Sequence, residues 1–221
     1  MMSSKDSNND KAIVLLSGGI DSSTCLYWAK NRGYEVHALT INYHNRWIKE
    51  IEATRSIAEM AGVELREIDA PFVMEIFNLY GLDSKNYKSD DPRWPFYIAS
   101  KNLLFYAIAA HIAEYMKARW IVGGHTKEDT LFFKDATREY IDAMNSLLKH
   151  GFMLNEPAEI VVPLIDIDKY DVVRLAVELG VPLEHTWSCH LRVEEPCGRC
   201  NGCVARSNVF NALGINIRKS A

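Results

Sequence analysis

The sequence predicts an α/β protein with a doubly wound parallel sheet and a C-terminal cysteine cluster. Three observations support this: short apolar runs alternate with segments of helical spacing, a glycine-rich turn follows the first apolar run, and four of the five cysteines gather near the end of the chain. The 221 residues, 48% hydrophobic and 24% charged, have the length and composition of one large globular domain. A disordered or fibrous protein is thereby excluded.

Strands and helices alternate in the first part of the chain. Ala12–Leu16 is a short apolar run that ends in a glycine turn, which predicts a buried strand. Asp21–Lys30 has helical spacing and stops shortly before a glycine, a common C-terminal signal. The alternation continues with a strand at Val36–Ile41, a helix at Trp47–Met60 and a strand at Glu64–Ile68. This order of elements is typical of a parallel, doubly wound sheet.

The second part begins with a polar loop at Leu82–Pro95, whose length is typical of a lid, a binding loop or a disordered segment. The pattern then predicts a helix at Ser100–Met116, a strand at Trp120–Val122, a helix at Arg138–Leu148, a strand at Ile160–Leu164 and a helix at Asp168–Leu179. We therefore expect a disordered tail over residues 1–10, one α/β domain over 11–182 and a cysteine-rich segment over 183–221.

Charge and hydropathy restrict the partners and the compartment. The chain has 25 Lys and Arg against 29 Asp and Glu, a net charge of −4, and an isoelectric point near 6.0, which argues against a strongly basic nucleic-acid-binding protein. No apolar run approaches the ~20 residues that a bilayer crossing needs. Met1–Asp10 lacks the apolar stretch of a secretory signal. We expect a cytoplasmic protein without a membrane partner.

The turn between the first predicted strand and helix reads Ser17-Gly18-Gly19-Ile20-Asp21-Ser22-Ser23. Its glycines let the backbone approach a ligand closely, and free N–H groups at the helix start, with serine hydroxyls, form a cradle for an anion such as phosphate. The alternative is an ordinary tight turn in which Asp21 or Ser22 caps the helix. The turn lacks the Gly-Lys-Ser/Thr ending of a Walker loop and the third glycine of a dinucleotide fingerprint.

Four clustered cysteines form the second chemical signal. Cys197, Cys200 and Cys203 lie within seven residues and Cys189 precedes them, so four thiolates could surround one ion as in structural zinc sites. The alternatives are unligated cysteines, an iron–sulfur cluster, and a site in which His190 replaces one thiolate. Zinc is favoured because the run lacks the fourth Cys and the Pro of ferredoxin-type sequences. The segment 183–221 is therefore predicted to bind zinc.

The glycine turn is similar to the SGGxDS loop of the N-type ATP pyrophosphatases, which have a Rossmann-like, adenine nucleotide alpha hydrolase-like fold. Three further stretches resemble the 7-cyano-7-deazaguanine synthase family within that group. They are the helix start Lys101–Phe105, the acidic loop Gly123–Asp129 with Asp135, and a C-terminal signature made of Thr186–Cys189 and Cys197–Arg206. The resemblance covers residues 11–210, and the combination of loop and tail is specific for this family.

The resemblance implies an ATP-dependent carbon–nitrogen ligase. Members of the family convert 7-carboxy-7-deazaguanine and ammonia into 7-cyano-7-deazaguanine, the precursor of queuosine and archaeosine in tRNA. Adenylation turns a poor carboxylate oxygen into the leaving group AMP, so ammonia can attack. A second ATP then activates the amide, which is dehydrated to the nitrile. Mg²⁺ is implied as well, because charge develops on the pyrophosphate leaving group.

By the same resemblance, each functional group has candidate residues. The set for ATP is Leu16, Ser17, Gly18, Gly19, Ile20, Asp21, Ser22, Ser23 and Thr40; the set for the substrate is Tyr43, Arg46, Lys101, Asn102, Gly124, Asp129 and Asp135. The proposed catalytic residues are Ser17, Asp21, Lys101 and Lys127, which would orient groups and stabilise charge. The zinc ligands are Cys189, Cys197, Cys200 and Cys203.

The chain departs from the family pattern where the substrate would bind. Asn42–Trp47 replaces the usual Asp-Tyr-Gly-Gln-Arg-His, Lys101 replaces an arginine, and Thr137 occupies another arginine position. Lysine cannot reproduce the planar fork of arginine. The runner-up function is therefore a paralogue that adenylates a carboxylate and transfers it to a different amine, on a protein or nucleic acid, stopping at an amide. A tRNA sulfur transferase and a non-catalytic zinc module that binds RNA or protein are further alternatives.

Two expectations about partners complete the interpretation. An N-terminal-nucleophile glutaminase needs a cysteine at the start of the chain, and position 2 is Met2, so we expect ammonia to come from outside. The family resemblance also implies a homodimer.

Overall fold

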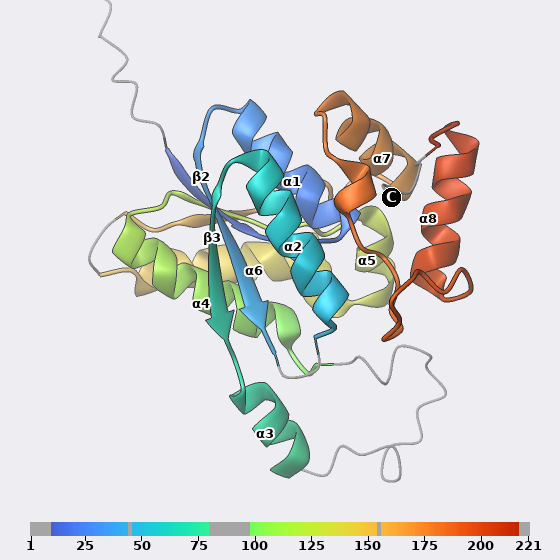
Figure 1. Ribbon diagram of the computed structural model, residues 1–221. Helices are drawn as coiled ribbons and strands as arrows, with labels where there is room; N and C mark the ends of the chain where they lie inside the picture. Colours follow the sequence, from blue (N-terminus) through green and yellow to red (C-terminus); the bar gives the residue numbers. More distant parts are fainter. Residues whose placement is uncertain (1–9, 44–45, 80–97, 154–155, 217–221) are drawn as a thin grey trace, which may run out of the picture.

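The computed structural model describes residues 10–43, 46–79, 98–153 and 156–216. At its centre is a five-stranded sheet in which every neighbouring pair is parallel (Figure 1). In chain order the strands are β1 (Lys11–Leu15), β2 (Glu35–Asn42), β3 (Glu64–Asp69), β4 (Trp120–Val122) and β5 (Glu159–Val161).

The order of the strands places a topological switch point at the centre of the sheet. The order is β3-β2-β1-β4-β5, so β1 pairs with β2 on one side and with β4 on the other, and Val14 lies opposite both Ala38 and Val122. Ligands bind in open α/β sheets where the strand order reverses, beyond the carboxyl ends of the strands. The segments that follow β1 and β4 are therefore the first place to look for a site.

Helices cover both faces of the sheet, which confirms the predicted doubly wound α/β fold (Figure 1). One core contains alternate residues of β1, such as Ala12 and Val14, with residues of α1 (Ile20–Asn31), α2 (Ile48–Ala61), α7 (Lys169–Glu178) and α8 (Asn201–Ala212). The other contains Ile13 and Leu39 with residues of α4 (Lys101–Met116) and α6 (Arg138–Gly151). β1 is buried on both faces and therefore reads as a continuous apolar run, whereas the edge strand β3 has no buried residue.

Most predicted elements agree with the structure to within a few residues, and β4 agrees at both ends. The last strand is shorter than predicted: β5 ends at Val161, and the chain then turns, with the N–H of Ile165 donating to the carbonyl of Val162. Three helices were not predicted: α3 (Phe72–Leu79), α5 (Lys127–Phe132) and α8. Short 3-10 helices, η2 (Lys134–Ala136) and η3 (Leu183–His185), complete the described elements.

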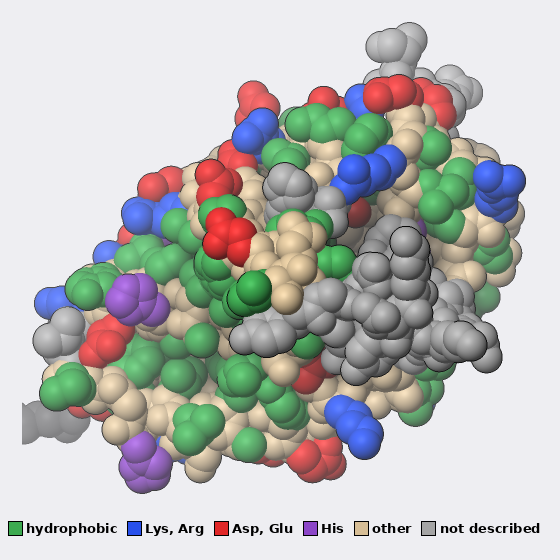
Figure 2. Space-filling model, turned by 90° about the horizontal axis from the view of Figure 1, so that it is seen from below, with side chains coloured by type: hydrophobic (Ala, Val, Ile, Leu, Met, Phe, Trp, Pro, Cys, Tyr) green, Lys and Arg blue, Asp and Glu red, His purple; other side chains and the backbone are tan. Residues whose placement is uncertain are grey.

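α3 extends beyond the carboxyl edge of the sheet and buries none of its residues (Figure 1). Phe72, Ile76 and Leu79 are exposed by 39%, 52% and 75%. Figure 2, which views the molecule from the same end, shows further hydrophobic side chains on the surface among charged ones. This end of the molecule therefore exposes apolar side chains of α3 to solvent.

The cysteine-rich segment joins the rest of the chain through α8. Val209 and Phe210 lie in the same core as Val172 and Val173 of α7. The division at residue 182 stays a prediction, as does the disordered tail, nine of whose ten residues lie outside the described ranges. The Leu82–Pro95 loop also lies outside them. In the described ranges no helix is both long and apolar enough to cross a bilayer.

The packing of α7 gives a stability prediction with a built-in control. Val173 is fully buried and Val177, one turn later, is 53% exposed. Val173→Ala should lower the free energy of unfolding by about 2 kcal/mol, because it removes two buried side-chain carbon atoms and their apolar contacts. Val177→Ala should change it by less than about 0.5 kcal/mol. Urea unfolding followed by circular dichroism measures both, and equal losses would contradict the assigned packing of α7.

Candidate active site

The turn after β1 is a compact, hydroxyl-lined bend. The N–H of Ser17 donates to Oγ of Ser22 (3.1 Å), and the two serine oxygens lie 3.0 Å apart. The hydroxyls of Ser22 and Ser23 donate to the carbonyl of Gly19 at 3.2 and 2.7 Å. No side chain caps the first turn of α1, so the alternative of an ordinary capped turn is not supported. The amide end of α1 is thus left to an outside acceptor.

Gly18 is required by its surroundings. Its φ is +81°, in the left-handed region, and a Cβ built there would lie 2.7 Å from the backbone nitrogen of Thr54 in α2. The bend is therefore pressed against the first turns of α2. This contact fixes the loop relative to a second helix as well as to its own.

Arg46 holds the underside of the loop. One guanidinium nitrogen donates to the carbonyl of Ser17 (2.7 Å) and to Oγ1 of Thr54 (2.6 Å), and the other bonds Oγ1 of Thr40 and Oδ1 of Asn42 (3.1 Å). Only 4% of the Arg46 side chain is exposed. The structure thus brings Arg46 and Thr40, assigned from the sequence to substrate and to ATP, into one network beneath the loop.

Asp21, in the first turn of α1, forms an ion pair with Lys169, the first residue of α7, through both carboxylate oxygens. Burial raises the pKa of Asp21, Lys169 opposes that shift, and the carboxylates of Asp129 and Glu128 add to it. The backbone N–H of Lys169 also donates to Glu128 (3.1 Å). Lys169 was missed by sequence reasoning, although its place just after the predicted last strand, beside Asp168, was a usable signal.

The segment after β4 lies directly against the loop after β1. A Cβ at Gly124 would be 3.0 Å from the nitrogen of Ser22, so a larger residue would require the two segments to shift apart slightly. The chain then enters α5 through a capping box in which Asp129 accepts from the N–H (2.8 Å) and the hydroxyl (3.0 Å) of Thr126. Two of the predicted substrate residues, Gly124 and Asp129, therefore shape the switch point itself.

The start of α4 brings four other predicted substrate residues to the same edge. Asn102 donates to Asp135 through its N–H (3.3 Å) and its side-chain amide (3.0 Å), which joins α4 to η2. The rings of Tyr43 and Phe105 lie 6.0 Å apart. Desolvation lowers the pKa of Lys101, although its side chain reaches solvent, and the carboxylates of Asp135, Asp129 and Glu50 oppose the shift. An anionic substrate would meet this lysine beside the loop.

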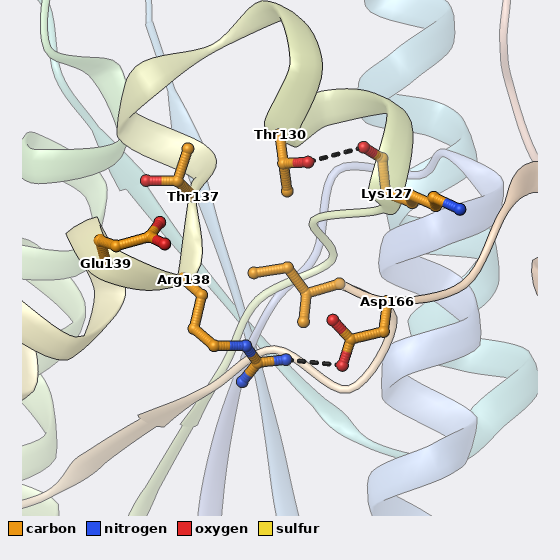
Figure 3. A pocket seen from close by; sticks show the side chains of 7 residues that line it. Lys127, Thr130, Thr137, Arg138, Glu139 and Asp166 are labelled. Carbon is orange, nitrogen blue, oxygen red and sulfur yellow. Dashed lines mark hydrogen bonds and ion pairs between the residues drawn. The ribbon is translucent and has the colours of Figure 1, made fainter.

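Lys127, predicted to be catalytic, lies at a pocket that none of the residues of the Ser17–Ser23 loop lines. It borders a pocket between α5, the start of α6 and the turn before α7, and its ammonium points away from the other labelled side chains (Figure 3). Across the pocket Arg138 pairs with Asp166 at 2.7 Å. None of the lining residues belongs to the loop: they are Lys127, Thr130, Thr137, Arg138, Glu139, Ile165 and Asp166.

The four predicted cysteines converge. Their sulfur atoms all lie within 4.8 Å of one another, with Cys197–Cys203 and Cys189–Cys200 at 3.9 Å. Sulfurs about 2.3 Å from a tetrahedral zinc ion lie about 3.8 Å apart, so the set fits one such ion. A four-iron cluster is itself larger and holds its thiolates farther apart. Backbone N–H groups of Arg199 and Cys200 lower the pKa of Cys197 to about 6, which favours the thiolate.

The cysteine segment also contacts the loop. The N–H of Trp187 donates to the carbonyl of Gly18 (2.8 Å), two residues before the first cysteine. Arg206 of α8 donates to Oγ1 of Thr186 (2.6 Å) and to the carbonyl of Leu183 (2.7 Å). The indole of Trp47 donates to the carbonyl of Val193 (3.1 Å). The bend is therefore held between the sheet, α2 and the cysteine segment, and the contacts of Trp187 and Arg206 had no signal in the sequence.

Comparisons with known proteins agree with this geometry. The family model described as "Queuosine biosynthesis protein QueC" matches residues 11–214. The chain is 38% identical over 209 residues to a 7-cyano-7-deazaguanine synthase of a Nitratiruptor species, covering 92% of this chain and 95% of the relative. It is 34% identical over 212 residues to the enzyme of that name from Archaeoglobus fulgidus, covering 93% and 87%.

A solved structure extends the similarity to the fold. A U34-tRNA thiolase, NcsA from Methanococcus maripaludis, which carries a four-iron, four-sulfur cluster, is similar with a TM-score of 0.52 and 19% identity. The match covers 95% of this chain and 67% of that one. At this identity the likeness concerns the fold alone, which is the adenine nucleotide alpha hydrolase-like fold expected from the sequence.

Substitutions at two glycines with similar φ distinguish the cost of a close contact from the cost of a left-handed backbone. Gly18 and Gly33 have φ values of +81° and +79°, but nothing lies within 4 Å of a Cβ at Gly33. Gly33→Ala should cost roughly 1–2 kcal/mol of unfolding free energy from the left-handed backbone alone. Gly18→Ala should cost clearly more, because the loop must also move away from Thr54. Equal costs in urea unfolding would mean that the contact with α2 is not tight.

Proposed function

This chain belongs to the QueC family of queuosine biosynthesis proteins, and from that premise we propose that it makes 7-cyano-7-deazaguanine from 7-carboxy-7-deazaguanine, ammonia and ATP. The proposal rests on one observation: the loop after β1 contacts the segment after β4 at the switch point, in a chain that matches the family model over residues 11–214. The reaction class is that of an ATP-dependent carbon–nitrogen ligase.

ATP is proposed to bind with its pyrophosphate on the bend of Ser17–Ser23. The serine hydroxyls and the uncapped N–H groups at the start of α1 would bind the anion, and the helix end adds its partial positive charge. The adenine would lie toward Leu16 and Thr40, which follow and flank the central strands. Asp21 supplies a carboxylate that fits Mg²⁺, which prefers oxygen ligands and, when bound, neutralises charge on the departing pyrophosphate.

The carboxylate to be adenylated is proposed to lie beside Lys101 and Asn102 at the start of α4. Lys101 offers a positive charge to the substrate, while Asp135 and Asp129 accept hydrogen bonds from donors on a deazapurine edge. Tyr43 offers an aromatic face. Holding the carboxylate and ATP in fixed positions supplies much of the acceleration in such a reaction.

Zn²⁺ is proposed as the resident ion of the four cysteines. It would supply no chemistry to the reaction; it would fix the segment whose Trp187 holds Gly18. Four unpaired thiols that await a metal require a reducing compartment, which supports a cytoplasmic location. The homodimer implied by the family is proposed as well, and the exposed apolar side chains of α3 are consistent with a further contact.

The runner-up is transfer of the adenylated carboxylate to a different amine, with an amide as product. It is favoured by the replacement of arginine by Lys101 and by the use of Arg46 beneath the loop, which leaves fewer guanidinium groups for a carboxylate or phosphate.

Product analysis tests the proposed function. Incubation with 7-carboxy-7-deazaguanine, ATP, Mg²⁺ and ammonium should give AMP, pyrophosphate and a mass that matches the nitrile. Ser17→Ala and Asp21→Ala should slow pyrophosphate release on the order of 10²-fold, since each removes a group that faces the transferring phosphate. Amide without nitrile would support the runner-up. Wild-type activity in both variants would contradict the loop as the ATP site, and glutamine hydrolysis would contradict the external ammonia source.

Metal analysis tests the cysteine cluster. The purified chain should hold about one zinc per chain, and the double variant Cys197→Ser with Cys200→Ser should lose it. Cys25→Ala is the matched control, because Cys25 is buried in α1, away from the cluster, and its replacement should leave zinc bound. Iron with acid-labile sulfide in the wild-type chain would instead favour a sulfur-transfer enzyme.

A further inference from the structure

Three buried polar side-chain atoms in the described part of the chain have no hydrogen-bond partner: the Tyr106 hydroxyl, Nε2 of His125 and Oε2 of Glu128. All three are on, or packed against, the segment that follows β4, and the rings of Tyr106 and His125 lie 5.8 Å apart. Buried polar atoms in folded proteins are nearly always paired. The unpaired Nε2 of His125 and the unpaired hydroxyl of Tyr106, which packs against that ring, mark a position beside the segment after β4 where another molecule can supply a partner.

Of these three residues, His125 lies next to the contact between the segment after β4 and the loop after β1. It follows Gly124, whose backbone presses on Asp21 and Ser22 of the nucleotide loop. The charges of Lys101, at the start of α4, and of Asp135, in η2, also act on the ring. A group bound at the switch point between ATP and the deazapurine would therefore meet Nε2 of this ring.

The surroundings keep the imidazole neutral. Burial lowers the pKa of His125; Lys101 lowers it further, while Asp129 and Asp135 oppose the shift. Tyr106, the remaining neighbour, packs against the ring and keeps its proton, since burial raises the pKa of that phenol far above its usual range. A neutral imidazole has one ring nitrogen that accepts a proton. In the tautomer with the proton on Nδ1, that nitrogen is the unpartnered Nε2, where His125 can act as a base.

We propose that His125 accepts the protons that leave the substrate nitrogen. This inference rests on the proposed function. When ammonia attacks the acyl-adenylate, a C–N bond forms, the C–O bond to AMP breaks with its electron pair leaving on AMP, and one proton leaves the nitrogen. When the amide is adenylated by the second ATP and AMP leaves, the C–O bond breaks and two more protons leave the nitrogen to give the nitrile. Each proton needs an acceptor at the reacting nitrogen, and His125 hands it on to solvent between steps.

His125→Gln separates proton transfer from nucleotide chemistry, because glutamine keeps a polar tip of similar reach but is not a base. Pyrophosphate release in the first adenylation should stay within about twofold, whereas nitrile formation should fall by 10²-fold or more, in the range of general-base catalysis. His111→Gln, an exposed histidine of α4, is the control and should change neither rate.

Two readouts distinguish a base from a merely structural residue. The wild-type rate of nitrile formation should fall as the pH drops through the pKa of His125, because the protonated ring cannot accept, and this acidic limb should be absent in His125→Gln. Free imidazole should partly restore nitrile formation in His125→Ala. Equal loss of pyrophosphate release and nitrile formation, or an unchanged acidic limb, would overturn the inference.

The same assay distinguishes a failure of the proposed nitrile synthesis from a failure of the proposed role of His125. If the wild-type chain forms the amide only, the proposed nitrile synthesis fails, and the amide yield of His125→Gln still decides whether His125 takes the first proton. If the wild-type chain releases pyrophosphate but transfers the acyl group to no ammonia at all, both proposals are overturned.

Discussion

The constraint on which the structure depends is the close approach of bare backbone at two glycines. Gly18 brings the loop after β1 against Thr54 of α2, and Gly124 brings the segment after β4 against Ser22. A side chain at either position would separate elements that have to touch. Gly18 follows β1 and Gly124 follows β4, so both contacts lie near the reversal of the strand order, at the edge where ligands bind in open α/β sheets.

The cysteine segment completes this arrangement from outside the sheet. Trp187 reaches Gly18 through the backbone, and α8 returns to the core through Phe210. A metal ion at the cysteines would therefore order a segment that touches the loop directly, without taking part in the chemistry. The thiolase that shares the fold carries an iron–sulfur cluster, whereas the sulfur spacing here fits a single ion.

The sequence predicted those features that local pattern encodes. β1 and β4 were found because buried parallel strands are apolar runs, and the cysteine cluster because its ligands are close along the chain. The loop was found from its glycines and serines. The ion pair between Asp21 and Lys169 joins residues that are far apart in the sequence. The burial of Arg46 beneath Ser17 depends on neighbours that only the folded chain brings together. α3 and α8 were missed because one is short and the other lies among cysteines and polar residues that obscure helical spacing.

The ion pair between Asp21 and Lys169 has a consequence for how a highly charged ligand enters. Separating two partly buried opposite charges is costly when neither finds a new counterion. In the proposed function, a nucleotide that arrived with its divalent cation would bring both at once: a cation for the carboxylate and phosphate oxygens for the ammonium. Loading would then be an exchange of counterions, in which neither side chain is left uncompensated. Nucleotide without the metal, or metal without the nucleotide, would have to break the pair and leave one of its charges alone.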